Sequence, residues 1–201
     1  MSIQINYKNS GLKKPLTNLV LFADEKFNIS NLKKYISDSE FFYINDLLKT
    51  FDLKKNLLIF ELNSKKKIVL ISVKSNLETS DIENLGAEFY ERINHENKNE
   101  YFVNSDSIKS KNENFIGYFL HGLKLKSYEF NLYKSKKEQK LISINVIGNK
   151  NKITVKNELR FKAIEEGTFF ARDLVSEPPN VLNPKEYTSR LLKLRKLGIK
   201  V

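Results

Sequence analysis

The sequence predicts a layered α/β domain, in which helices cover a mixed sheet, followed by a long linker helix. Over residues 1–150, short apolar runs typical of strands alternate with stretches whose apolar residues recur every three or four positions. Elements that alternate in this way bury their apolar faces by stacking helices on a sheet. The chain has 201 residues, of which 40% are hydrophobic, so it can form one such domain and an appendage.

The apolar runs predict the strands. Residues 18–23, NLVLFA, are continuously apolar, which is typical of a buried strand. Residues 57–62 and 68–73 are separated by the polar triplet 63–65, and this arrangement predicts a hairpin. The predicted strands are 3–5, 18–23, 57–62, 68–73, 101–103 and 141–147.

Three helices are predicted between these strands. Residues 38–51 and 110–128 carry apolar residues at helical spacing. The third begins at Ser80-Asp81-Ile82-Glu83, which has the spacing of a capping box, and is expected to end at His95 and Asn97. On the helix that begins at Ser80, the side chains expected to be buried are Ile82, Leu85, Phe89 and Ile93. On the helix over 110–128, they are Phe115, Ile116, Phe119, Leu120 and Leu123.

A linker helix is predicted to start near Thr154 and to carry one apolar face. Pro178 and Pro179 end it, because proline lacks an N–H donor and disfavours the α conformation in the residue before it. The residues expected to form the apolar face are Ala163, Ile164, Gly167, Phe170, Ala171, Leu174 and Val175.

A further helix is predicted after the two prolines. Asn183 can cap it, Pro184 suits its first position, and Glu186 stands where a capping box needs an acid. Leu191, Leu194 and Leu197 give it an apolar stripe, Gly198 is a natural stop, and residues 199–201 begin a strand-like pattern. This stretch indicates a connector that leads into another domain.

Two motifs resemble the leucyl aminopeptidase family, also called cytosol aminopeptidases or M17 peptidases. Residues 171–187, ARDLVSEPPNVLNPKEY, are similar to the segment that joins the two domains of these enzymes. Residues 122–137, GLKLKSYEFNLYKSKK, resemble a family segment near the end of the N-terminal domain. Both occur in the family's order, although Ser176 replaces the usual Asn, and Glu129-Phe130-Asn131 replaces Arg-Phe-Asp.

The resemblance implies a fold, a division of the chain and a function. It implies a macro-domain-like N-terminal domain over residues 1–150, a linker helix and Pro-Pro turn over 151–183, and the start of a truncated catalytic domain over 184–201. The family enzymes are homo-hexamers that remove N-terminal amino acids from peptides, using two divalent metal ions, manganese or zinc. Their metal-binding motifs lie in the C-terminal domain, so no catalytic, cofactor-binding or metal-binding residue is assigned here. The chain by itself is expected to be inactive.

The residues themselves offer little catalytic chemistry. His95 and His121 are the only histidines, and their separation does not suit a metal site, so His121 is expected to pack within its helix. The carboxylates of Glu165, Glu166, Asp173 and Glu177, with Arg172 among them, suggest either a divalent-cation site or a solvated helix face with local ion pairs. No nucleophile-elbow, Walker A or dinucleotide-binding motif occurs.

The alternative is a stand-alone binding module. The net charge is +11, but 30 of the 35 basic residues are lysines, whereas nucleic-acid recognition favours arginine. Nucleic acid would bind at Lys124, Lys126, Lys134, Lys136, Lys137 and Lys140, or these lysines surround a buried stripe of Tyr128, Phe130 and Leu132. Macro domains bind ADP-ribose, but residues 74–77, which follow the strand predicted at 68–73, lack the glycines of a phosphate cradle.

The sequence also bears on the compartment. There is no cysteine, which excludes disulfides and thiolate metal sites. No apolar stretch has the length of a signal peptide or a membrane span. A cytoplasmic protein without membrane contact is expected.

Overall fold

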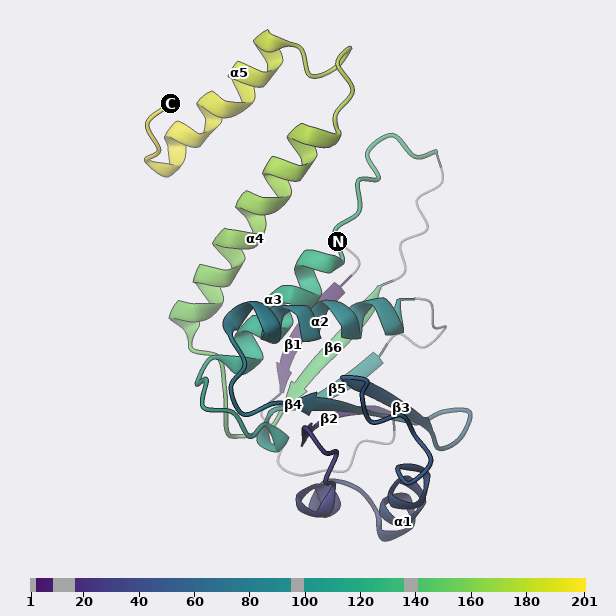
Figure 1. Cartoon of the computed structure of the whole chain (residues 1–201). Helices are drawn as coiled ribbons and strands as arrows, with labels where there is room; N and C mark the ends of the chain where they lie inside the picture. Colours follow the sequence, from purple (N-terminus) through teal and green to yellow (C-terminus); the bar gives the residue numbers. More distant parts are fainter. Residues whose placement is uncertain (1–2, 9–16, 95–99, 136–140) are drawn as a thin grey trace.

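The computed structural model describes residues 3–8, 17–94, 100–135 and 141–201. In these residues, six strands form one mixed sheet with the order β1-β6-β5-β2-β4-β3 (Figure 1). All neighbouring strands are parallel except β3 and β4, which are antiparallel. The strands are β1 (Ile3–Lys8), β2 (Asn18–Asp24), β3 (Leu57–Glu61), β4 (Lys67–Val73), β5 (Glu100–Asn104) and β6 (Ile142–Ile147).

All six predicted strands are confirmed, and so is the hairpin. In the hairpin, Leu58 of β3 pairs with Leu70 of β4. Its turn is closed by Asn63, whose side-chain Oδ1 accepts hydrogen bonds from the backbone N–H groups of Lys65 and Lys66. The apolar run of β2 lies at the centre of the sheet and is buried on both faces, which explains why it shows no alternation.

Helices cover both faces of the sheet (Figure 1). One face carries α2 (Thr79–Ile93) and α3 (Phe115–Lys126), whose apolar side chains share a core with β2, β4, β5 and β6. At its centre Phe22 meets Phe115 and Phe119 edge-on, with ring centroids 5.4 and 5.3 Å apart. The other face is covered by the 3-10 helix η1 (Ser30–Tyr35) and by α1 (Asp38–Leu47). The predicted α/β class is therefore confirmed.

The bounds of three predicted helices differ from the structure. The capping box of α2 lies two residues earlier than predicted, at Glu78 and Asp81, where Glu78 N donates to Asp81 Oδ2 at 3.0 Å. Before α3, the side chains of Ser110 and Asn112 accept backbone N–H groups two residues on, and these local bonds compete with the helix until Phe115. The helix predicted over 38–51 ends at Leu47 in a tight turn. The residues His95 and Asn97, expected to end α2, lie outside the described residues.

Helix α4 (Val155–Ser176) leaves the sheet and extends away from it (Figure 1). It starts where predicted, and Thr154 caps it, since the Thr154 side chain accepts the N–H of Asn157. After the Pro-Pro turn, Asn183 caps α5 (Pro184–Leu192) by accepting the N–H of Glu186 at 3.0 Å. A short 3-10 helix, η3 (Lys193–Leu197), follows and stops at Gly198, which has a left-handed φ of 80°.

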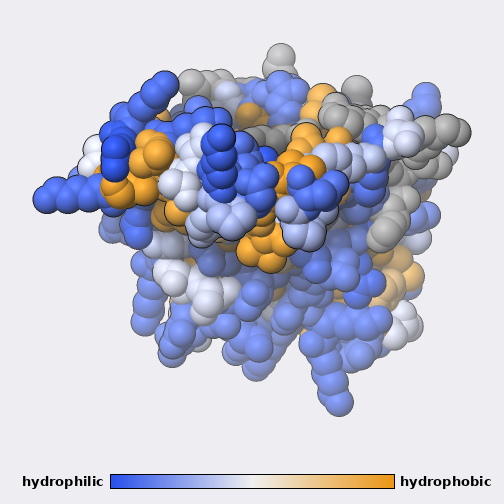
Figure 2. All heavy atoms as spheres, turned by 90° about the horizontal axis from the view of Figure 1, so that it is seen from above, coloured by the Kyte–Doolittle hydropathy of each residue, from blue (hydrophilic) through white to orange (hydrophobic). Residues whose placement is uncertain are grey.

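The predicted apolar face of α4 does not face the sheet and its helices. Within this fully described helix, the buried residues are Phe161 and Glu165, which lie on the side that packs on α3. Phe170 and Leu174 are half-buried, whereas Ala163, Gly167 and Val175 are exposed, Val175 to 87%. Apolar patches are visible among charged side chains when the molecule is viewed from above (Figure 2). We call the exposed or half-buried row Leu159, Ala163, Gly167, Phe170 and Leu174 the outer seam of α4.

Candidate functional site

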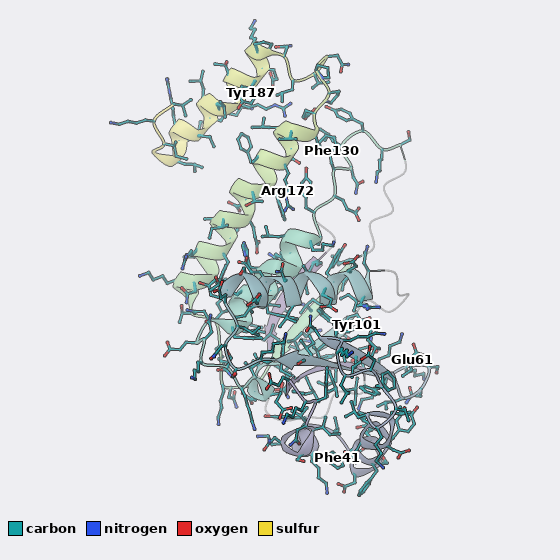
Figure 3. The ribbon with its side chains drawn as sticks, viewed as in Figure 1. Phe41, Glu61, Tyr101, Phe130, Arg172 and Tyr187 are labelled. Atoms are coloured by element: carbon teal, nitrogen blue, oxygen red, sulfur yellow. The ribbon has the colours of Figure 1, made fainter. Side chains whose placement is uncertain are left out.

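The two motif segments contact each other in the structure. Arg172 Nη1 on α4 donates a hydrogen bond to the backbone oxygen of Leu125 at 2.6 Å. Its guanidinium group lies 5.4 Å from the ring centroid of Tyr128, and the Tyr128 hydroxyl donates to Asp173 Oδ1 at 2.7 Å. Figure 3 shows Arg172 on α4 and Phe130 on the segment after α3, near the far end of α4. The two motifs thus form one structural joint.

A second set of contacts joins α4 to α5. The Glu177 side chain is buried and accepts hydrogen bonds from the Tyr133 hydroxyl and from Arg190 Nη1. Arg190 also donates through Nε to Glu186 at 3.0 Å. The hydrogen bond from Tyr133, together with the charge of Arg190, outweighs desolvation and lowers the pKa of Glu177. Glu177 therefore remains ionised and connects three segments of the chain.

The carboxylates of α4 serve as structural partners. Glu165 is buried and lies 3.2 Å from Lys124 Nζ, and Glu166 lies 4.0 Å from Lys162 Nζ. The expectation of a solvated helix face is therefore wrong for Glu165 and Glu177, because both are buried and paired. Among the described residues, no group of three or more His, Asp or Glu side chains has an arrangement that could hold a metal ion.

His121 packs inside the molecule, as predicted. Its side chain is 5% exposed, its Nδ1 lies 2.8 Å from Glu83 Oε1 on α2, and its ring lies against Phe161 of α4 with centroids 5.1 Å apart. The carboxylate of Glu83 accepts, so Nδ1 carries the proton in the neutral ring. Nε2 is buried and has no hydrogen-bond partner in the described part of the chain. His95 lies outside the described residues.

The carboxyl ends of β5 and β6 hold a loop whose amides are already occupied. Gly148 has a φ of 121°, and the backbone N–H groups of Asn149 and Lys150 both donate to Asp106 Oδ1. A phosphate would need such amides to be free. The sequence showed only a polar break here, and the partner Asp106 is 42 residues before Gly148. This geometry gives nucleotide binding no support.

The basic segment is mostly neutralised where the structure describes it. Lys124 pairs with Glu165, and Lys126 Nζ lies 3.6 Å from Glu91. The expected buried stripe is wrong for Leu132, which is 56% exposed. Tyr128 and Phe130 are half-buried. Lys134 is exposed, and Lys136, Lys137 and Lys140 lie outside the described residues.

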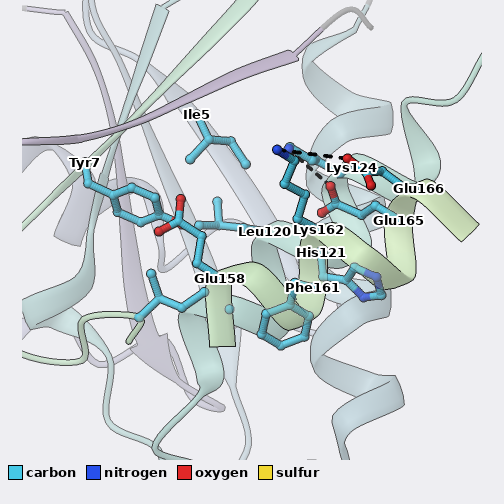
Figure 4. Close-up of a pocket in the computed structure, with 12 residues that line it drawn as sticks. Ile5, Tyr7, Leu120, His121, Lys124, Glu158, Phe161, Lys162, Glu165 and Glu166 are labelled. Atoms are coloured by element: carbon cyan, nitrogen blue, oxygen red, sulfur yellow. Dashed lines mark hydrogen bonds and ion pairs between the residues drawn. The ribbon is translucent and has the colours of Figure 1, made fainter. Parts of the chain in front are cut away.

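One cavity gathers ionisable groups from β1, α3 and α4. Its volume is about 200 Å³, and Figure 4 shows its lining, which includes Tyr7, Lys124, Glu158, Lys162 and Glu166. A neighbouring cavity of about 170 Å³ shares Tyr7, Ile153 and Glu158 with it. Tyr7 is 42% exposed, and desolvation by its surroundings, followed by the charges of Glu158 and Glu165, raises its pKa. Neither Tyr7 nor Glu158 stands out in the sequence, because they are 151 positions apart and belong to no motif.

Known proteins similar to this chain are aminopeptidases. The probable cytosol aminopeptidase of Rhizobium rhizogenes is 31% identical over 133 residues, which cover 62% of this chain and 26% of that protein. That of Sinorhizobium fredii is 36% identical over 90 residues, covering 41% of this chain and 18% of that protein. The chain thus spans about a fifth to a quarter of these relatives. No family model matches the chain.

Solved structures show the same fold. A mutant of tomato leucine aminopeptidase aligns with a TM-score of 0.71 and 19% identity, over 97% of this chain and 42% of that one. The bottromycin maturation enzyme BotP, in a complex with Mn, aligns with a TM-score of 0.62 and 10% identity, over 91% of this chain and 37% of that one. The chain is therefore related to the cytosol aminopeptidases over part of their length, as its two motifs predicted.

Proposed function

We propose that this chain is the N-terminal, non-catalytic portion of a metal-dependent leucyl aminopeptidase, which removes N-terminal amino acids from peptides. In this proposal residues 1–150 are the macro-domain-like N-terminal domain, 151–183 are the linker helix and Pro-Pro turn, and 184–201 begin the catalytic domain. The two metal ions, manganese or zinc, would be held by the catalytic domain of a cytoplasmic homo-hexamer. The names of the relatives support the cytoplasmic location. None of the described helices combines the length and apolar character that crossing a membrane requires.

The observation that carries the proposal is the orientation of α4. The joint formed by Arg172, Asp173 and Glu177 holds the polar side of α4 against the segment after α3. In the part of the chain that the structure describes, the first three residues of the outer seam are exposed and the last two are half-buried. Exposed apolar rows of this kind mark interaction surfaces in soluble proteins. The tomato structure extends well beyond the part that matches this chain, and that remainder supports a catalytic domain as the partner of the seam.

A chimeric enzyme tests the proposal. The portion of the Rhizobium rhizogenes aminopeptidase that aligns with this chain would be replaced by residues 1–201, and hydrolysis of leucine p-nitroanilide would be measured with manganese or zinc. We expect an active chimera, and no activity from the chain alone. A chimera that folds and assembles but cannot hydrolyse the substrate would count against the proposal, and so would metal-dependent hydrolysis by the chain alone.

A matched pair of substitutions tests the seam. Leu159→Asp introduces a charge in the outer seam of α4, and Leu53→Asp introduces the same charge at an exposed apolar position after α1. We expect Leu159→Asp to reduce the activity and assembly of the chimera while leaving the unfolding midpoint of the isolated chain unchanged. Leu53→Asp should leave the activity intact. Equal effects of the two substitutions would contradict docking at α4.

A further inference from the structure

Helix α5 turns back from the far end of α4, and burial does not explain its direction (Figure 1). Within α5, all of which the structure describes, no residue is buried. Leu191 of its apolar stripe is half-buried, whereas Tyr187 and Leu192 are exposed to 43% and 38%. The angle between α4 and α5 is therefore set mainly by the turn that joins them and by polar contacts.

The hydrogen bonds of the Pro-Pro turn do not reach α5. The backbone N–H groups of Val181 and Leu182 donate to the oxygen of Pro178 at 3.0 and 2.9 Å. These bonds close the turn, but they include no atom of α5, which begins at Pro184. A contact beyond the turn is needed to hold α5 at one angle.

The buried carboxylate of Glu177 makes this contact. Its side chain is 2% exposed. Oε2 accepts a hydrogen bond from the hydroxyl of Tyr133, in the segment after α3, and Oε1 accepts one from Arg190 Nη1 on α5 at 3.0 Å. In the described part of the chain, no other side-chain hydrogen bond or ion pair joins residues 184–201 to residues that precede the turn.

Arg190 is held in the orientation that this contact needs. Its Nε donates to Glu186 Oε1, one helical turn earlier, at 3.0 Å. The planar guanidinium group can donate through Nε and Nη1 to two carboxylates at once, which fixes the direction of the second bond. Both oxygens of Glu177 have a donor of their own, so one carboxylate holds two segments in place. Buried ionic groups can serve in this way to specify one arrangement of neighbouring elements.

We propose that Glu177 is a positioning residue that locks the angle between α4 and α5. Tyr133 connects the carboxylate to the domain formed by the sheet and its helices, and Arg190 connects α5 to the carboxylate. The lock also orients the catalytic domain that α5 begins, and this part of the inference rests on the proposed function. Glu177→Gln breaks the lock, because a carboxamide has one acceptor oxygen and its NH₂ group would face a donor.

A distance measured between α4 and α5 tests the lock in the full chain. Since the chain has no cysteine, spin labels can be attached at Lys156→Cys on α4 and Ser189→Cys on α5, both of which replace exposed residues. Double electron–electron resonance would give the distribution of distances between the labels, and we expect one narrow peak. Glu177→Gln should raise the population outside this peak about tenfold or more, the worth of one hydrogen bond to a charged group. The amide NMR shifts of the sheet strands should stay unchanged, which separates a lost lock from a misfolded domain.

Three further substitutions make the test specific. Glu166→Gln is the matched control, because it removes an exposed carboxylate of the same helix, 4.0 Å from Lys162 Nζ, and it should leave the peak narrow. Arg190→Gln should broaden the distribution as Glu177→Gln does, and the double variant should broaden it no further, since both changes remove the same contact. Tyr133→Phe should have a smaller effect, because the ion pair to Arg190 remains.

The outcomes separate the lock from the proposed function. An unchanged distribution in Glu177→Gln, equal broadening by Glu166→Gln, or additive effects of Glu177→Gln and Arg190→Gln would overturn the lock. Failure of the proposed function would appear instead as an inactive chimera, whatever the distances show. In an active chimera, Glu177→Gln should lower kcat/KM about tenfold through misplacement of the catalytic domain, and Glu166→Gln should not. An unchanged kcat/KM would overturn the role of the lock in orienting that domain.

Discussion

The crossing of α2 and α3 makes a sharp prediction about Gly122, the first residue of one motif. A Cβ atom added to Gly122 would lie 1.9 Å from the backbone oxygen of Glu83, and one added to Gly86 would lie 1.9 Å from the backbone oxygen of Phe119. An ordinary carbon–oxygen contact is about 3.3 Å. Gly122→Ala therefore requires the two helices to separate by about 1.4 Å, because a backbone oxygen cannot rotate away as a side chain can.

The expected cost follows from two opposing effects. Overpacking a close contact costs typically about 1–3 kcal/mol, and a clash between two backbones belongs at the upper end. Alanine recovers up to about 1 kcal/mol of helix propensity relative to glycine. We expect Gly122→Ala to reduce the free energy of unfolding by about 2 kcal/mol.

The same substitution on α4 provides the control. Nothing lies within 4 Å of a Cβ atom added to Gly167, so Gly167→Ala meets no resistance. It should stabilise the chain by about 0.5–1 kcal/mol through helix propensity alone. The chemical change is identical at both positions, but the expected changes in the free energy of unfolding have opposite signs.

Urea denaturation followed by far-UV circular dichroism measures both effects, since the chain has no tryptophan. With a slope of about 2 kcal/mol per molar urea, the midpoint of Gly122→Ala should fall by about 1 M, and that of Gly167→Ala should rise by a few tenths of a molar. An unchanged or higher midpoint for Gly122→Ala, with an unchanged slope, would refute the reasoning from the helix crossing.

Three further predictions concern polar contacts. Burial raises the pKa of Glu40, but the hydrogen bonds from Lys66 and Ser37 and the charge of Lys66 together outweigh burial, so the pKa lies below its ordinary 4.5. The stabilisation is present above pH 4.5 and is lost as the pH falls through the lowered pKa. Glu40→Gln should cost about 1 kcal/mol at pH 7 and flatten this acid dependence in thermal unfolding. Arg172→Lys removes the guanidinium group that donates to Leu125 O, and hydrogen exchange in the last two turns of α4 should become about tenfold faster. Asp106→Ala leaves two backbone N–H groups without an acceptor and should lower the unfolding free energy by about 2 kcal/mol, and Asp106→Asn by less.

Each of these has a result that contradicts it. For Glu40, an acid transition identical to that of the unmodified chain would mean that its pairing with Lys66 does not couple to folding. For Arg172, unchanged exchange in α4 would show that the joint is not what holds the helix end. For Asp106, equal stability of the alanine and asparagine variants would show that the carboxylate oxygen is not the acceptor that closes the loop.

The sheet was predictable because its signals are local. Residues 19–23 are apolar on both faces, which by itself is typical of a central strand. The hairpin is closed within its own turn, because Asn63 accepts hydrogen bonds from residues two and three positions later. The order of the strands was not predictable, because β6 pairs with β1 and β5, and these strands begin 139 and 42 positions before β6 in the sequence. Helix starts were misplaced where serine and asparagine side chains compete for backbone N–H groups, as before α3.

The candidate site was harder to predict than the fold, because its residues are assembled by tertiary contacts. The motifs identified the segments that meet at the joint, but nothing in the spacing of Tyr128 and Asp173 shows that they bond to each other across 45 positions. Likewise, the pairing of Glu165 with Lys124 joins residues that are 41 positions apart in the sequence. The spacing of apolar residues in the sequence predicts which face of a helix is apolar. The ion-pair partners of a helix depend instead on which of its turns packs beside its neighbour, here α4 beside α3, and the sequence does not show this.

The orientation of α4 shows why its periodicity predicted a face but not the neighbour of that face. An amphipathic helix held only by apolar burial would turn its apolar row toward the nearest core. Here Phe161, Glu165 and Arg172 lie on one side of α4, and each contacts a different residue of α3: the His121 ring, the Lys124 ammonium group and the Leu125 oxygen. Rotating the helix by one residue, about 100°, would break these contacts together and leave the Glu165 charge buried without its partner, which costs several kcal/mol. The polar side of α4 therefore sets its rotation about its own axis, and the apolar row faces outward as a consequence.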